Sequence, residues 1–187
     1  MERRELLKMI AALTGGVFIG GELLTSCKTG PSIGGAKFND ADLAFLDEVA
    51  ETILPATKTP GAKAAKVGKF MTVMVNDTYE DKDQKIFHEG MAKLEEASKK
   101  ANGKSFLEAT PAERTTLLTA LDKEAKDYQK SKKKEDASHY FTMMKQLTLF
   151  GYFTSKEGAT QALRYVAVPG KFDGAYPYKK GDKAWAT

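Results

Sequence analysis

The sequence predicts an all-α protein, a single-domain helical bundle of about six helices with an extended aromatic, Gly/Pro-rich C-terminal tail. Apolar residues recur at the spacing of one buried helix face in successive segments. No run alternates apolar and polar residues long enough to predict a strand. A chain of 187 residues, 42% of them hydrophobic, is also long enough to form one domain with a genuine core.

Residues 1–26 have the features of a removable twin-arginine export signal. Arg3 and Arg4 are followed, after Glu5, by two apolar residues and a lysine, the order such signals use. The apolar stretch over 9–21 is too short to span a membrane, which takes roughly 20 apolar residues, and glycines dilute it. We therefore expect cleavage rather than a membrane span.

The signal ends in Leu24-Thr25-Ser26-Cys27, which resembles the bacterial lipobox. Cys27 is the only cysteine, so it cannot form an internal disulfide, and the alternative to lipidation is a free thiol. Several acyl chains on one cysteine would hold the protein firmly at a membrane. We expect a lipid-anchored protein on the periplasmic side, with a lipidated flexible tether over 27–37 and a domain over 38–187.

The expected helices follow from apolar spacing and from end signals. The clearest start is Thr110-Pro111-Ala112-Glu113, a capping box with proline at the first helical position. Asn39 caps the first helix, Asn102-Gly103 stops the third, and Thr154 with Glu157 is predicted to cap a short last one. The expected spans are 39–54, 67–79, 83–100, 110–130, 136–150 and about 154–165. Their predicted inward residues are Leu43, Leu46, Val49, Ile53, Leu54, Val67, Phe70, Met71, Met74, Val75, Ile86, Phe87, Met91, Leu94, Leu117, Leu118, Leu121, Ala125, Tyr128, Phe141, Met144, Leu147 and Leu149.

The tail from about residue 166 has no apolar period. Its aromatic residues are Phe172, Tyr176, Tyr178 and Trp185. They either fold back on the domain's own surface or pack into a partner, where aromatic anchors dominate the binding energy. Both alternatives stay open, and each can hold for different residues.

No pattern of reactive residues predicts catalysis, a metal site or a cofactor in this chain. His88 and His139 are far apart in sequence and lack metal-ligand spacing. Haem attachment, nucleotide-binding and serine-nucleophile motifs are missing. The net charge of +4 is mild, and the lysine run at 130–134 is followed by two acids, so no nucleic-acid partner is predicted.

Three blocks of sequence resemble the gluconate 2-dehydrogenase subunit 3 family. They are Phe38-x-x-x-Asp42 followed by Glu51-Thr-Ile-Leu-Pro55 and Thr59-Pro-Gly-Ala62, then Phe150-Gly-Tyr-Phe-Thr-Ser-Lys-Glu-Gly158, then Tyr165-x-x-Val-Pro-Gly170. The resemblance implies a non-catalytic small subunit that binds, helps mature and co-exports a large flavoprotein dehydrogenase, which holds FAD and oxidises a sugar or polyol. A cytochrome c subunit often accompanies such a pair. The candidate partner-binding residues that it implies are Gly151, Tyr152, Phe153, Ser155, Gly158, Pro169 and Gly170, to which the tail adds Tyr176 and Trp185.

Two other functions compete with this one. A free-standing lipoprotein that binds a small ligand or envelope component predicts a concave pocket lined by Tyr and Trp and a well-covered surface. A cofactor-free enzyme has no nucleophile and base to support it. The aromatics of 150–153 can also be core residues, so a contiguous exposed apolar patch is the feature that distinguishes an accessory subunit.

Overall fold

A computed structural model describes residues 33–186, except residue 36, and these residues belong to one folded unit. The predicted signal peptide, Arg3, Arg4 and Cys27 lie outside the described residues. Within the described part, no helix is long and apolar enough to cross a membrane.

The fold is all-α, as predicted. The α-helices are α2 (Asp40–Ile53), α3 (Val67–Thr78), α4 (Asp81–Asn102), α5 (Pro111–Ser131) and α6 (Tyr140–Thr154). A π-helix, η1 (Gly158–Ala162), follows α6, and two short strands complete the described chain, β1 (Arg164–Tyr165) and β2 (Trp185–Ala186).

Helix ends coincide with predictions where a side chain supplies a strong cap. Asn39 and Asp42 form a capping box at the start of α2, and Thr110 and Glu113 form one at the start of α5. Gly103 ends α4 in the left-handed conformation at φ 71° and donates its N–H to Lys99 O at 2.9 Å. These backbone groups are satisfied within a few residues of each end, so the bounds follow from local sequence.

The predicted bounds of the last two helical segments are wrong. Helix α6 begins at Tyr140 rather than 136, because His139 Nδ1 accepts the Phe141 N–H at 3.2 Å and caps the helix there. The short final helix is capped by Ser155 rather than by the predicted Thr154. Ser155 Oγ accepts the Gly158 N–H at 3.0 Å, whereas Thr154 Oγ1 donates to Phe150 O within α6. The final helix ends at Ala162 because Tyr165 belongs to β1.

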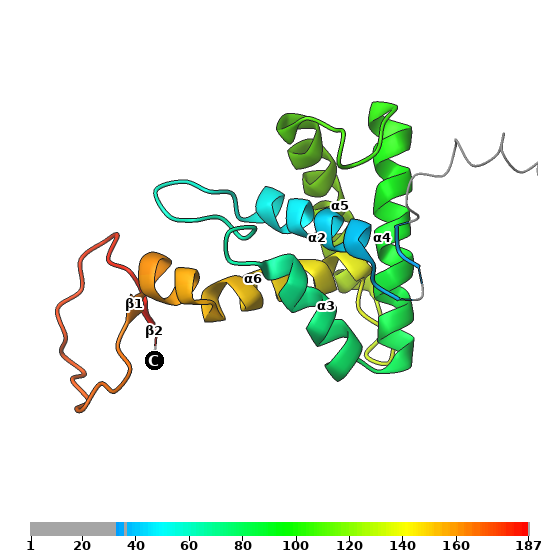
Figure 1. Ribbon diagram of the computed structural model, residues 1–187. Helices are drawn as coiled ribbons and strands as arrows, with labels where there is room; N and C mark the ends of the chain where they lie inside the picture. The colour runs from blue at the N-terminus through cyan, green and yellow to red at the C-terminus, as the bar shows by residue number, and fades with distance from the viewer. Residues whose placement is uncertain (1–32, 36, 187) are drawn as a thin grey trace, which may run out of the picture. The chain divides into compact units, whose positions relative to one another are not determined.

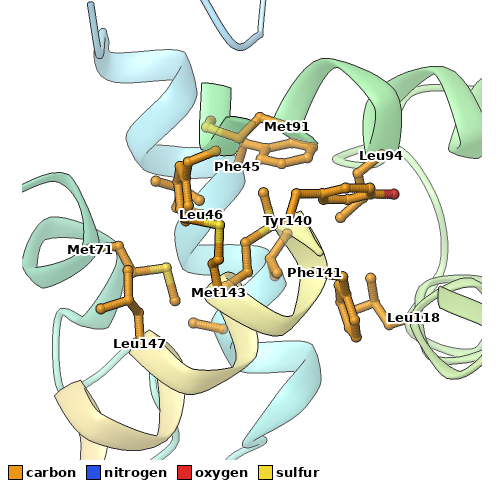
Figure 2. Close-up of a cluster of buried hydrophobic side chains, with 14 of the residues drawn as sticks. Phe45, Leu46, Met71, Met91, Leu94, Leu118, Tyr140, Phe141, Met143 and Leu147 are labelled. Carbon is orange, nitrogen blue, oxygen red and sulfur yellow. The ribbon is translucent and has the colours of Figure 1, made fainter. Parts of the chain in front are cut away.

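The core is organised around α6, which contacts α2, α3, α4 and α5 (Figure 1). Its N-terminal half inserts Phe141, Met143 and Leu147 between the other helices (Figure 2), and Met144 is buried in the same core. Most of the predicted inward residues are buried or half-buried. Tyr128 and Leu149 are the exceptions, at 37% and 38% exposure, so for these two the prediction is wrong.

The folded unit begins five residues before the predicted Phe38. Ile33 packs against the core, and the Gly34 N–H donates to the buried Asp42 carboxylate at 2.8 Å. Phe38 stacks on His88 with ring centroids 4.3 Å apart. Residues 33–35, which we assigned to the tether, therefore lie on the helical body.

Residues 166–184 form a loop that is closed at its base. Strands β1 and β2 pair in parallel, with Arg164 opposite Trp185 and Tyr165 opposite Ala186. The Arg164 N–H donates to Ala184 O at 2.8 Å and the Val166 N–H to Ala186 O at 2.9 Å. Figure 1 shows this loop beyond the C-terminal end of α6. We call residues 166–184 the closed loop.

Candidate partner-binding surface

The described residues contain no arrangement suited to metal binding. No group of three or more His, Cys, Asp or Glu side chains within this part of the chain could hold a metal ion. His88 is buried in α4 and His139 caps α6, so each has a place in the helical framework. The feature that stands out is apolar surface left uncovered.

Five apolar side chains from α3 and α6 form what we call the aromatic face. Its members are Phe70, Val73, Leu149, Phe150 and Phe153. Phe150 is 52% exposed and Val73 is 48% exposed. Phe70 joins the two helices, because its ring meets that of Phe150 edge-on with centroids 5.6 Å apart. An uncovered apolar surface shared by two helices is a common mark of a protein-binding site.

The aromatic face arises where α6 changes from a core helix to a surface helix. Leu149, Phe150 and Phe153 stand at i, i+1 and i+4, so they lie on one side of the C-terminal half of α6. In the N-terminal half of the same helix, the side chains of Tyr140, Phe141, Met143, Met144 and Leu147 are buried. The face is therefore held by a helix whose other end is fixed in the core.

Gly151 positions the aromatic face without forming it. It is buried, and a Cβ at this residue would lie 2.5 Å from Cδ1 of Phe70. The missing side chain lets Phe70 lie directly against the backbone of α6. Gly151 thus acts on the surface through Phe70 rather than by touching a partner.

Three further predicted residues hold the end of α6 in shape. Tyr152 is 4% exposed and its hydroxyl donates to Pro60 O at 2.7 Å. Ser155 Oγ donates to Tyr152 O at 2.6 Å. Gly158 is buried, and a Cβ there would lie 1.9 Å from Tyr152 O. Among the predicted partner-binding residues of this block, Phe153 has a large exposed side chain, whereas Gly151, Tyr152 and Gly158 are buried by the domain itself. Their contact with a partner stays a prediction.

The predicted tail residues divide into two groups. Pro169 and Gly170 are exposed in the closed loop. Tyr176 and Trp185 are each 50% exposed and pack on one another edge-on, with centroids 5.3 Å apart. The Arg164 guanidinium lies over the Trp185 ring at 4.4 Å. Tyr176 and Trp185 therefore fold back on the chain, while Phe172 and Tyr178 do not.

Two titratable groups with shifted pKa, Glu48 and Tyr140, lie in contacts between helices. Burial raises the pKa of Glu48, but hydrogen bonding to Lys63 and the charge of Arg114 outweigh it, so the net pKa is lowered from 4.5. Burial raises the pKa of Tyr140 to about 12, with a further contribution from the Glu124 charge. The causes of both shifts are burial and neighbouring charged groups within the helical body.

Sequence reasoning missed Val73 and placed Leu149 in the core. Val73 lies off the predicted apolar stripe of α3, and an apolar residue off the stripe is the signal that could have identified it. Leu149 obeys the helical spacing, so its exposure depends on where neighbouring helices end. Only the tertiary arrangement reveals that.

The fold and this surface define a small all-α protein with an exposed apolar face. The chain belongs to the gluconate 2-dehydrogenase subunit 3 family, whose model matches residues 40–170. No curated protein and no solved structure was found to match it. The family describes an accessory subunit of a dehydrogenase complex, and the matched segment contains the whole aromatic face.

Proposed function

We propose that this chain binds the large flavoprotein subunit of a sugar or polyol dehydrogenase, assists its maturation, and is exported with it. The observation that carries the proposal is the aromatic face, which lies within the family-matched segment. Fully burying a side chain of the size of Phe or Leu contributes about 1.5–3 kcal/mol. A partner that covers Phe150 and its neighbours would remove a large apolar surface from water.

The export signal supports transport as a pair. Twin-arginine export carries folded proteins, and its usual cargoes have loaded a cofactor beforehand. The sequence of this chain has no cofactor motif, so the signal is better explained by a bound partner that folds around FAD. Arg3 and Arg4 would then export both chains.

The anchor extends the same proposal. Acylation at Cys27 would hold the complex on the periplasmic face of a bacterial membrane. Electrons from FAD would pass to an acceptor, with a cytochrome c subunit as the candidate. In this arrangement the chain supplies binding and attachment, and the large subunit supplies the chemistry.

Co-purification tests the proposal directly. The full-length chain is affinity-purified from a mild-detergent extract, and the preparation is analysed by mass spectrometry and by flavin absorbance. We expect a large chain with bound flavin in near-equal amount. A colourless preparation that contains only this chain would contradict the proposal.

Substitution of Phe150 then tests the surface. Phe150→Ala should weaken capture of the large subunit while leaving the unfolding midpoint nearly unchanged, because the side chain is half exposed. Leu107→Ala is the matched control, since Leu107 is an exposed apolar residue, 38% exposed, in the segment between α4 and α5. If both variants captured the large subunit equally well, the aromatic face would not be the binding surface.

Export is tested with Arg3→Lys and Arg4→Lys together. We expect the large subunit to remain in the cytoplasm with the small one, and Cys27→Ala to release the exported pair from the membrane. If the large subunit reached the periplasm without these arginines, it would not depend on the small subunit for export.

A ligand-binding lipoprotein is a second candidate, favoured by one observation. The closed loop surrounds a mainly apolar hollow of about 390 Å³, lined in part by Tyr176 and Trp185. Pockets for small molecules range from roughly 300 to 1,000 Å³. Native mass spectrometry of the purified chain separates the two candidates, because a retained small molecule supports the second and a retained flavoprotein the first.

A further inference from the structure

The closed loop is ordered by its own hydrogen bonds. The Tyr176 N–H donates to Asp173 O at 3.3 Å, and the Lys179 N–H donates to the Asp182 carboxylate at 2.9 Å. Gly170 and Gly181 adopt positive φ angles of 73° and 95°, which glycine tolerates without strain. These turns, together with the β1–β2 pairing, define the path of the loop.

The loop is nevertheless uncovered by the helical body. Every residue from 167 to 185 is exposed. Phe172 is 96% exposed, Val168 is 81% exposed and Tyr178 is 76% exposed. Ordering the backbone of a loop costs conformational entropy, and this loop recovers little of that cost by burying its own apolar groups. A loop that is preorganised and exposed loses less conformational entropy when it binds a partner.

A cation and two aromatic rings form the rigid base of the loop. Arg164 stacks on Trp185 and donates from Nη1 to the Tyr176 hydroxyl at 3.3 Å. It also lies 4.0 Å from the Asp182 carboxylate. Tyr176 and Trp185 therefore support the loop, while Phe172, Val168 and Tyr178 remain free for contact.

The closed loop presents both exposed apolar side chains and a hollow. The hollow beside the base is lined by Val166, Pro169, Phe172 and Tyr176, among others. The surrounding charges are mainly positive, with Lys171, Lys179, Lys180 and Lys183 against Asp173 and Asp182. Such a surface suits an apolar cleft with an acidic rim on another protein.

We propose that the closed loop is a second contact on the large dehydrogenase subunit, in which Phe172 and Tyr178 enter an apolar, acid-rimmed cleft and the hollow receives a partner side chain. This inference rests on the proposed function. Most of the loop lies beyond the family-matched residues 40–170, whereas the aromatic face lies within them. The face is then the contact common to the family, and the loop selects this chain's own partner.

Two other occupants fit the observations less well. A second copy would bring the same four lysines together, and the chain as a whole carries a net charge of +4. A membrane surface would have to reach the loop, yet residues 33–35, which follow the proposed anchor, lie against α2 and α4. Figure 1 shows that segment at the opposite end of the helical body from the loop. The loop also follows α6 closely in the chain, through η1 and β1, and α6 carries Leu149, Phe150 and Phe153 of the aromatic face.

The test uses the full chain co-expressed with the large subunit, and compares dissociation constants for three proteins. These are the wild type, the double variant Phe172→Ala with Tyr178→Ala, and the control Leu107→Ala. We expect the double variant to bind roughly 10- to 100-fold more weakly, as for loss of interface anchors, and the control to match the wild type. Thermal unfolding should be the same for all three, because the substituted side chains are exposed.

The outcomes separate this inference from the function on which it rests. If the wild type fails to bind a flavoprotein, the proposed function falls and the loop proposal with it. If the wild type binds and the double variant binds equally well, the function stands and the loop proposal is overturned. It is equally overturned if the double variant keeps its partner but loses binding to vesicles of anionic phospholipid, since the loop is then a membrane contact.

Discussion

The ring of Phe70 lies against the backbone of Gly151, where a Cβ at residue 151 would be 2.5 Å from Cδ1 of Phe70. This approach brings α3 and α6 together beside the aromatic face. Real Cβ atoms do not lie this close to another carbon, so either the ring or the helix must shift when a side chain is added. The relationship explains why a buried glycine can affect a surface.

Gly151→Ala is therefore expected to lower the free energy of unfolding by about 1–3 kcal/mol, the usual range for overpacking. It should also weaken capture of the large subunit, because Phe70 no longer supports Phe150. Urea unfolding measures the first effect and co-purification the second. Phe150→Ala is the comparison, since it should reduce capture with little loss of stability. A Gly151→Ala protein with unchanged unfolding would show that Phe70 has room to move.

The fold was predictable where local chemistry decides it. The ends of α2, α4 and α5 depend on Asn39, Gly103 and Thr110, which satisfy helix-end groups from within a few residues. The start of α6 was misplaced because its cap is an imidazole nitrogen of His139, a residue outside the usual capping set. Sequence rules therefore predict a helix end correctly when its capping residue is one of the common types.

The surface was only partly predictable. Within the block at 150–158, Phe150 and Phe153 are exposed, whereas Gly151, Tyr152 and Gly158 are buried and act on the shape of the α6 end. Leu149 and Phe150 follow the same helical spacing as core residues. Leu149 and Phe150 are exposed because α6 extends past the neighbouring helices. The spacing of apolar residues within α6 does not show where those neighbours end.

The carboxylate of Asp42 joins the segment before α2 to the helical body. It is fully buried and accepts the N–H groups of Gly34 at 2.8 Å and Asn39 at 3.0 Å. Asp42→Asn replaces one acceptor by a donor, so we expect a loss of about 1–3 kcal/mol of stability and faster trypsin cleavage after the exposed Lys37. Asp40→Asn is the control, because it removes a charge from the same helix start at an exposed position. Equal behaviour of the two variants would mean that Asp42 acts only through its charge.

His88 makes stability depend on pH. It is 7% exposed, its Nδ1 has no hydrogen-bond partner among the described residues, and Gly34, Asp81, Lys85 and Glu89 line the pocket beside it. Burial lowers the pKa of His88 from 6.5, and the charge of Asp42 opposes this only in part. The unfolded chain therefore takes up a proton at a higher pH than the folded one, so stability falls as pH drops below about 6.5.

Urea unfolding between pH 7.5 and pH 5.5 measures this effect. One proton contributes at most about 1.4 kcal/mol per pH unit. His88→Met fills a similar space without titrating, so its stability should vary less over this range and should exceed that of the wild type at pH 5.5. The window stays above the range in which Glu48, whose pKa is lowered, is protonated. Parallel pH curves for the two proteins would show that His88 does not titrate differently on folding.

Arg114 and Lys63 share the carboxylate of Glu48, yet the two cations should differ in what they contribute. Arg114 is 13% exposed and also donates to Phe106 O at 2.9 Å and Leu107 O at 2.6 Å, whereas Lys63 is 53% exposed. Arg114→Lys keeps the charge but cannot reproduce the planar fork, so carbonyl acceptors lose their donors and we expect a cost of about 1–3 kcal/mol. Lys63→Met removes an exposed ion pair and should cost less than about 1 kcal/mol.

Raising the salt concentration should shrink the Lys63→Met effect on stability and leave the Arg114→Lys effect largely intact, because less exposed contacts are screened less. Urea unfolding at low and high salt measures the stability change of each variant. If Arg114→Lys, which conserves the charge, were as stable as the wild type, then the charge and not the geometry of the guanidinium would hold α5 to α2.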